Sequence, residues 1–156
     1  MAERDHLIAL RSAAIGYEQD YAAWLDRQIA LLRAGRFDEL DMPNLLDEVE
    51  SLGRSDFKGF VSAVEIVLLH MLKWDHQPTL RTRSWQGSIL EHRRRIAREL
   101  KDSPSYSARI DDAVERAYEA AQAAAVGQTG LPLATFPDTC PYDWEAITSR
   151  DHPLDD

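Results

Sequence analysis

The sequence has few of the residues that cross-link or interrupt a chain. It contains one cysteine, Cys140, so no disulfide can form within the chain. Glycine and proline contribute only seven residues each, which leaves long stretches free to be helical. No segment shows the sustained apolar–polar alternation of a half-buried strand. Together these absences predict an all-α protein.

Motifs for metal binding and catalysis are also missing. The chain has no Glu-x-x-His of the kind that builds di-iron bundles, and no His-Glu-x-x-His. Its histidines lack ligand spacing, although His70 and His76 could meet across a helix end. Cys140 has no histidine near it in sequence, and no other nucleophile motif stands out. We therefore predict no metal and no cofactor, and we favour a non-enzymatic protein.

No segment suits secretion or insertion into a membrane. The N-terminus lacks an apolar stretch of signal-peptide length. The most apolar run, residues 60–72, is interrupted by Glu65 and His70 and is shorter than the ~20 residues that span a bilayer. These features predict a cytoplasmic protein without membrane contact.

Charge is unevenly distributed along the chain. The net charge is −9, which argues against bulk binding to nucleic acid. Residues 73–101 nevertheless hold eight basic and three acidic residues, so the rest of the chain holds 10 basic and 24 acidic ones. A basic segment on an acidic protein either pairs internally or forms a local anion site.

One strongly apolar helix is the dominant feature of the sequence. Residues 57–74 place apolar side chains on every side of a helix, as in the buried centre of a bundle. We predict a single-domain bundle of four main helices around this central helix, plus a short C-terminal helix. The predicted domain covers residues 17–148, between a partly ordered arm at 1–16 and a frayed tail at 149–156.

Local signals place the helix ends. We expect one long helix from about Asn44 through Gly53, bent or briefly broken there, and ending before Gln77-Pro78. Ser84 is the expected N-cap of a helix over residues 85–101. Ser103 and Pro104 are expected to start a further helix over residues 105–126.

Two polar residues near apolar faces are candidate catalytic groups. Glu48 borders the apolar stripe of the first part of the long helix, and His70 lies within the central run. Their structural alternatives are a carboxylate paired with arginines and a neutral, hydrogen-bonded core histidine. Asp56 falls inside the same stripe as an acidic residue that needs a cation.

The loop between the central helix and the next one is a candidate anion site. Arg81 and Arg83 would stand beside a helix N-terminus, whose free N–H groups attract anions. Trp74 and Trp85 bracket this loop. We expect ligand contacts from Arg81, Arg83, Trp74, Trp85 and Asp56.

Three functions stay open at this point. The first is a binding or regulatory module with a polar groove of Arg, Glu, His and Trp side chains, taking an unknown protein partner or a small anion. The second is a hydrolase or phosphate-handling enzyme with Glu48 or His70 as base and an arginine clamp. The third is weak nucleic-acid contact through the Arg93–Arg98 surface. Either a monomer or a homodimer fits.

The order of several short stretches resembles a known family. They are YAAW (21–24), LLRAGRFDELDMPNLLDEVE (31–50), LGRSD (52–56), LLHMLKWDHQP (68–78), RSWQGSI (83–89), DSPS (102–105) and TGLPLATFPDTCPY (129–142). The chain is thereby identified as a member of the bacterial family called domain of unknown function 29. The resemblance implies a small helical cytoplasmic domain without an agreed activity. His76, Gly87 and Asp56 depart from the family pattern, so a site built on them would be peculiar to this chain.

Overall fold

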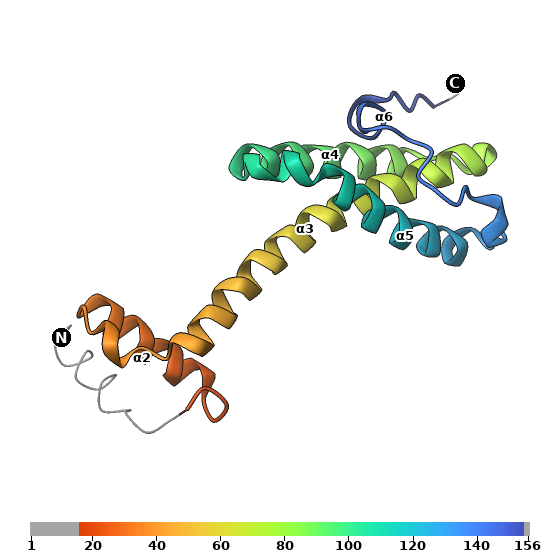
Figure 1. Cartoon of the computed structure of the whole chain (residues 1–156). Coiled ribbons are helices and arrows are strands. Elements are labelled where there is room, and N and C mark those ends of the chain that lie inside the picture. The colour runs from red at the N-terminus through yellow and green to blue at the C-terminus, as the bar shows by residue number, and fades with distance from the viewer. Residues whose placement is uncertain (1–15, 155–156) are drawn as a thin grey trace. The chain divides into compact units, whose positions relative to one another are not determined.

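The computed structural model describes residues 16–154 as helices joined by short connections (Figure 1). The α-helices are α2 (Tyr21–Arg33), α3 (Met42–His76), α4 (Arg83–Asp102), α5 (Ile110–Thr129) and α6 (Trp144–Ser149). Short 3-10 helices are η1 (Phe37–Glu39), η2 (Pro78–Leu80), η3 (Pro104–Arg109) and η4 (Leu133–Thr135). Within residues 16–154 there is no strand, and the predicted all-α class is confirmed.

The chain forms two compact units, residues 1–54 and 55–156. Helix α3 contributes its first part to one unit and the remainder to the other. It runs without interruption through Gly53 and ends at His76, directly before Gln77-Pro78 as predicted. The arm predicted at residues 1–16 lies outside the described residues, except for Gly16.

The first unit is a small helical hairpin. The Asp20 side chain caps α2 by accepting from the Ala23 N–H at 3.0 Å. The Trp24 indole donates to Asp41 Oδ2 at 2.9 Å, and the Asp41 N–H donates to Gln28 Oε1 at 2.9 Å. These bonds fix the start of α3 against α2. Asp41 also accepts from the Asn44 side chain, which is the largest factor that lowers the pKa of Asp41.

The second unit is built around residues 57–74, as the sequence predicts. Phe60, Val64, Val67 and Met71 are fully buried in its core. Ile89 and Ile96 contribute the inner face of α4. Helix α5 contributes buried alanines, whose small side chains allow a close approach to the core; they are Ala113, Ala117, Ala121 and Ala125.

Two predicted helix starts are wrong. Thr82, not Ser84, is the N-cap of α4, because its side chain accepts from the Trp85 N–H at 3.3 Å. Pro104 starts the 3-10 helix η3, and α5 begins only at Ile110. Threonine and serine can both cap a helix, so the sequence did not decide between Thr82 and Ser84 as the N-cap of α4.

The segment expected to fray is held in place as far as it is described. Ser149 ends α6, and His152 has only 6% of its surface exposed. Residues 155–156 lie outside the described part. A search of the described helices found none with the length and apolarity needed to cross a bilayer.

Two glycines near the end of α5 should respond in opposite ways to alanine. Gly130 caps the helix with φ +71°, a left-handed conformation that costs alanine about 1 kcal/mol. Gly127 is helical with open space around it, so alanine should gain roughly 0.5–1 kcal/mol there. Urea unfolding followed by circular dichroism should therefore show Gly130→Ala destabilised and Gly127→Ala stabilised. The same direction for both variants would contradict this account of the helix end.

Candidate functional site

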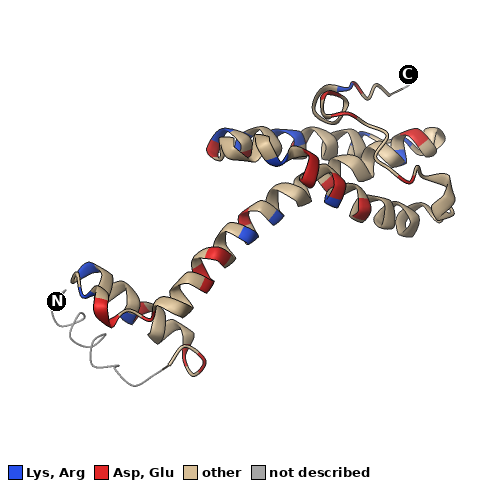
Figure 2. Ribbon diagram, in the orientation of Figure 1, with Lys and Arg blue, Asp and Glu red and all other residues tan. Residues whose placement is uncertain are grey.

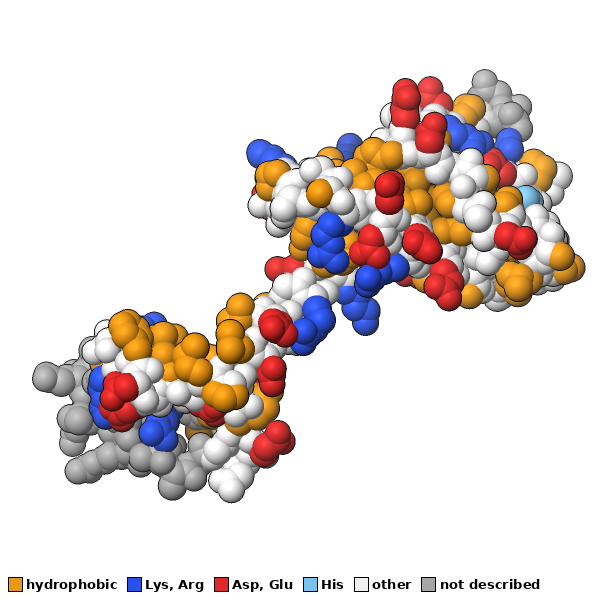
Figure 3. All heavy atoms as spheres, viewed as in Figure 1, with side chains coloured by type: hydrophobic (Ala, Val, Ile, Leu, Met, Phe, Trp, Pro, Cys, Tyr) orange, Lys and Arg blue, Asp and Glu red, His pale blue; other side chains and the backbone are white. Residues whose placement is uncertain are grey.

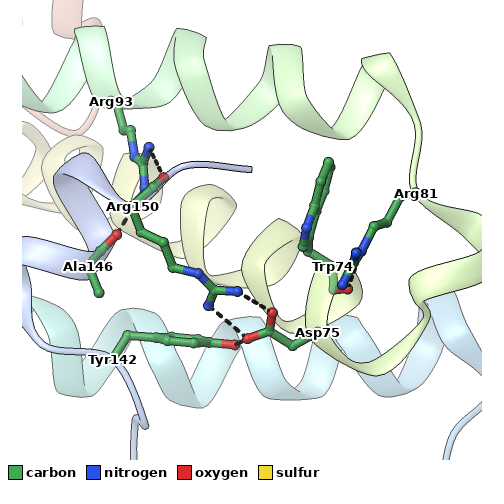
Figure 4. Close-up of polar contacts among 7 residues, drawn as sticks. All are labelled: Trp74, Asp75, Arg81, Arg93, Tyr142, Ala146 and Arg150. Atoms are coloured by element: carbon green, nitrogen blue, oxygen red, sulfur yellow. Dashed lines mark hydrogen bonds and ion pairs between the residues drawn. The ribbon is translucent and has the colours of Figure 1, made fainter. Parts of the chain in front are cut away.

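The carboxylate of Asp75, in the last turn of α3, ties down the C-terminal segment (Figure 4). Arg150 donates to it twice, from Nη2 to Oδ1 at 2.6 Å and from Nη1 to Oδ2 at 2.9 Å. The Tyr142 hydroxyl donates to Oδ2 at 2.8 Å. Such two-pronged arginine–carboxylate pairs are among the stronger polar contacts in proteins.

These bonds shift the pKa values of Asp75 and Tyr142. Burial alone would raise the pKa of Asp75, but the hydrogen bonds from Arg150 and Tyr142 outweigh it and the pKa is lowered. The pKa of Tyr142 is raised, first by burial and then by its bond to Asp75. The tyrosine therefore stays neutral and the aspartate stays charged at neutral pH.

Arg93 secures the same segment from α4. Its guanidinium donates to the carbonyls of Ala146 (2.9 Å), Ile147 (2.7 Å) and Arg150 (2.8 Å). It thereby binds carbonyls in the last turn of α6 and just beyond it, where the helix leaves carbonyls with few backbone partners. Of the predicted basic surface at 93–98, Arg93 is half-buried and bonded to this segment, and Arg95 pairs with Glu99 at 2.8 Å.

The predicted anion-site residues have separate roles. Arg81 donates to the Trp74 carbonyl at 3.0 Å, with its guanidinium carbon 5.2 Å from the Trp74 ring centre. Trp74 itself is buried. Trp85 stacks under Lys73, whose Nζ lies 4.4 Å from the ring centre.

The remaining two predicted ligand residues line different hollows. Exposed Arg83 borders one of about 310 Å³ together with Arg150 and His152. Exposed Asp56 borders another, beside Arg95 and Tyr106. The structure thus brings Arg81 to Trp74, but it places Asp56 in another hollow.

The two candidate catalytic residues also have partners of their own. In the first unit, Glu48 accepts hydrogen bonds from the hydroxyls of Tyr17 (2.6 Å) and Tyr21 (2.9 Å), rather than from the arginines we expected. The hydrogen bond to Glu48 raises the pKa of Tyr17 to about 12. In the second unit, half-buried His70 places Nδ1 at 2.8 Å from the Ile66 carbonyl, and burial lowers the pKa of His70.

A cleft of the second unit lies between α5 and residues 138–144, and sequence analysis missed it. It encloses about 610 Å³, within the range usual for small-molecule sites. Val114, Tyr118 and Trp144 supply apolar and aromatic surface, and Cys140 and Tyr142 come from the C-terminal wall. That wall is held by the Asp75 bonds and by Tyr118, whose hydroxyl donates to the Pro137 carbonyl at 2.6 Å.

Acidic residues surround this cleft. Asp111, Glu115 and Glu119 follow one another at four-residue spacing along α5, and Asp138 lies on the opposite wall. Figure 3 shows acidic side chains beside hydrophobic surface on the face of the second unit that it displays. Among the ion pairs of residues 16–154, none involves these four carboxylates. The spacing was visible in the sequence, but only the fold places it beside an apolar hollow.

Cys140 and Tyr118, which line the cleft, are poorly suited to act as a nucleophile or base. Burial raises the pKa of the Cys140 thiol, and its Sγ lies 3.5 Å from the Tyr142 carbonyl. Burial also raises the pKa of Tyr118 to about 12. Both groups are therefore neutral at pH 7, whereas a nucleophile or base needs a lowered or near-neutral pKa. Over residues 16–154, no group of three potential ligand side chains is arranged around a metal position.

Asp75→Asn should loosen the C-terminal segment. The neutral amide loses two charge-assisted bonds from Arg150, which should lower the free energy of unfolding by about 2 kcal/mol. Tyr142→Phe should cost about 1 kcal/mol, because it removes one bond only. Chemical unfolding measures both losses, and Glu91→Gln is the control for the loss of an exposed charge elsewhere in the second unit. Equal stability of Asp75→Asn and the control would refute the role of this pair.

His152 should make stability depend on pH. Burial, then Arg93 and Arg150, lower its pKa from 6.5 to about 4. The unfolded state binds the proton first, so the stabilisation is complete above pH 6.5 and is lost as pH falls toward 4. The loss should reach up to about 3 kcal/mol. It should be absent in His152→Phe, which keeps a ring where the His152 ring lies 5.3 Å from the Trp74 ring. Unfolding curves at several pH values test this, and parallel pH profiles of the two proteins would exclude it.

Comparison with known proteins identifies the family. The model of the domain of unknown function DUF29 matches residues 16–152, which is most of the chain. No match to a curated protein or to a solved structure was found. The match covers both α5 and the C-terminal wall of the cleft, as well as Asp75 and Arg150. The chain therefore belongs to the family called domain of unknown function 29, DUF29.

Proposed function

We propose that this chain is a non-enzymatic binding module that takes an elongated organic amine in the cleft between α5 and residues 138–144. One observation carries the proposal: a row of carboxylates without cation partners borders an apolar hollow of small-molecule size. We infer a bacterial, cytoplasmic setting from the sequence alone.

The acidic row has the spacing of a linear polyamine. Residues four apart on a helix are separated by about 6 Å along the axis. Asp111, Glu115 and Glu119 therefore present negative charge at a regular interval along one side of the cleft. Ammonium groups joined by short methylene runs repeat over a similar length. The methylenes can then contact Val114 and the rings of Tyr118 and Trp144.

Without a ligand this arrangement is unfavourable. Like charges at four-residue spacing destabilise a helix by roughly 0.2–0.5 kcal/mol per pair. Asp112, on a neighbouring helical position, avoids the problem by pairing with Arg116 at 2.7 Å and Arg109 at 3.5 Å. A polycation in the cleft would give the acidic row the positive partners that Arg109 and Arg116 give to Asp112.

The affinity expected for an amine is limited because the carboxylates of the cleft are exposed. Exposed ion pairs contribute about 0.2–1 kcal/mol each, and each buried methylene adds about 0.8 kcal/mol. Several exposed ion pairs together with several buried methylenes give a dissociation constant on the order of 10 µM to 1 mM. The neutral Cys140 and Tyr118 favour binding over chemistry.

The two alternatives have less support. The hydrolase alternative requires Glu48 or His70 beside an arginine clamp, whereas Glu48 is bonded to tyrosines and Arg81 to the Trp74 carbonyl. Nucleic-acid contact requires a broad basic face, whereas Arg93 donates to α6 carbonyls and Arg95 pairs with Glu99, which leaves Arg94 and Arg98 as the exposed arginines of this surface.

Spermidine is a suitable probe for isothermal titration calorimetry. We expect a salt-sensitive dissociation constant in the range given above, and binding at least ten-fold weaker for the monoamine butylamine. Glu115→Gln combined with Glu119→Gln should weaken spermidine binding about ten-fold or more, because two cleft charges are lost. The matched control is Glu91→Gln with Asp102→Asn, which removes two exposed charges of α4 outside this cleft.

Three results would overturn the proposal. The first is no binding in millimolar spermidine. The second is an equal effect of the cleft variant and the control variant, which would indicate general charge attraction. The third is binding of a lysine-rich peptide at the cleft without binding of spermidine, which would assign the cleft to a protein segment.

A further inference from the structure

The C-terminal segment, residues 136–152, forms one wall of the cleft and continues past it to α4. Its first part, residues 138–144, lines the cleft. Its second part contains α6 and is held by Asp75 and Arg93 through the bonds described above. Tyr142 belongs to both parts, because it lines the cleft and donates to Asp75 at 2.8 Å. One side chain therefore connects the cleft to the bonds that hold the segment.

The segment has little structure of its own. Helix α6 has six residues, which is too short to persist alone, and the rest of residues 136–152 is neither helix nor strand. Its fully buried apolar side chains are Phe136 and Ile147. The segment is docked, that is, bonded to α3, α4 and α5, only through these contacts between elements. When the contacts break, it can leave the bundle as one piece while the three long helices stay folded.

The docked segment also contains unfavourable features. His152 is almost wholly buried, and its Nε2 has no hydrogen-bond partner among residues 16–154. An unpaired buried polar group is destabilising. Burial lowers the pKa of Arg93, and the nearby charge of Arg150 acts in the same direction. The free energy of undocking is thereby smaller than it would be if every buried group had a partner.

An amine in the cleft would contact both walls. The acidic row lies on α5, along which Figure 2 shows acidic residues. The segment contributes the carboxylate of Asp138 and the rings of Tyr142 and Trp144 to the opposite wall. Undocking of the segment separates the two walls. A ligand that binds both of them therefore binds the docked state in preference to the undocked one.

We propose that an amine in the cleft controls the docking of the C-terminal segment, so that amine binding keeps the segment on α3 and α4 and amine loss favours its release. This regulation rests on the amine binding proposed above. Release exposes Phe136 and Ile147, together with the surface of the bundle that they cover. The amine thus decides whether this apolar surface is accessible, which is the output expected of a regulatory module.

The size of the effect follows from linkage. A ligand that binds only the docked state lowers the undocked population in proportion to its concentration above the dissociation constant. At a concentration roughly ten times its dissociation constant, spermidine should lower the undocked population about ten-fold. Coupling of this kind is reciprocal, so a variant that undocks the segment should bind spermidine more weakly. Its apparent dissociation constant rises as the inverse of the docked fraction.

Amide hydrogen exchange of the full chain, with and without spermidine, tests the proposal. The reporting amides are Ile147 and Arg150, which donate to carbonyls within or next to α6 and do not line the cleft. Spermidine at the concentration given above should slow their exchange about ten-fold, whereas the amides of α2, in the other unit, should keep their rates. Unchanged exchange at Ile147 and Arg150 with spermidine bound overturns the coupling alone. Absence of spermidine binding overturns both the coupling and the proposed function.

A double variant tests the reverse direction. Arg93→Gln with Arg150→Gln removes the bonds from both arginines to the segment and to Asp75, and neither residue lines the cleft. It should weaken spermidine binding about ten-fold. The matched control is Arg94→Gln with Arg98→Gln, which removes the same charge from exposed positions of α4 and should bind like the original chain. Circular dichroism should show the long helices intact in both proteins, and equal affinity of the two double variants would overturn the proposal.

Discussion

The contact of Asp75 with Arg150 and Tyr142 is the constraint on which the second unit depends. It joins Asp75, at the end of α3, to Tyr142 and Arg150, which lie 67 and 75 positions further along the chain. These two residues flank α6, a helix of only six residues. A short helix of this kind is unstable alone, so its position has to come from tertiary bonds. Arg93 adds three such bonds from α4 to the carbonyls of the same segment. Together they build the wall without which α5 would border no cleft.

Helix α5 serves two purposes with its two faces. Its inner alanines approach the core closely, which leaves little room for side chains and makes the packing depend on backbone shape. Its outer face then carries the acidic row of Asp111, Glu115 and Glu119. Because the inner face is fixed by packing, the carboxylates on the outer face are held at regular intervals. A ligand that matches those intervals needs to order only its own chain.

The sequence predicted the features that arise from local pattern. The all-round apolar character of residues 57–74 identified the core, and Gln77-Pro78 identified the end of α3, because both signals act through neighbouring residues. The Asp75 contact could not be predicted, since Asp75, Tyr142 and Arg150 are ordinary residues until the fold brings them together. For the same reason residues 149–154 looked like a tail. The sequence also predicted an inward apolar face on the first part of α3, whereas Val49 and Leu52 keep 63% and 65% of their surface exposed. Periodicity shows that a face is apolar but not what covers it.

Amine binding and docking of the C-terminal segment are governed by different forces, which makes them separable. Binding of an amine to the acidic row is mainly an attraction between exposed charges, and salt screens it over about 10 Å at 0.1 M. The charges of Asp75, Arg93 and Arg150 are half-buried, and salt screens such charges much less. Docking also removes Phe136 and Ile147 from water, and salts such as sulfate strengthen burial of that kind. In concentrated sulfate the segment should therefore stay docked without the amine, so the amine controls its position only where salt is low.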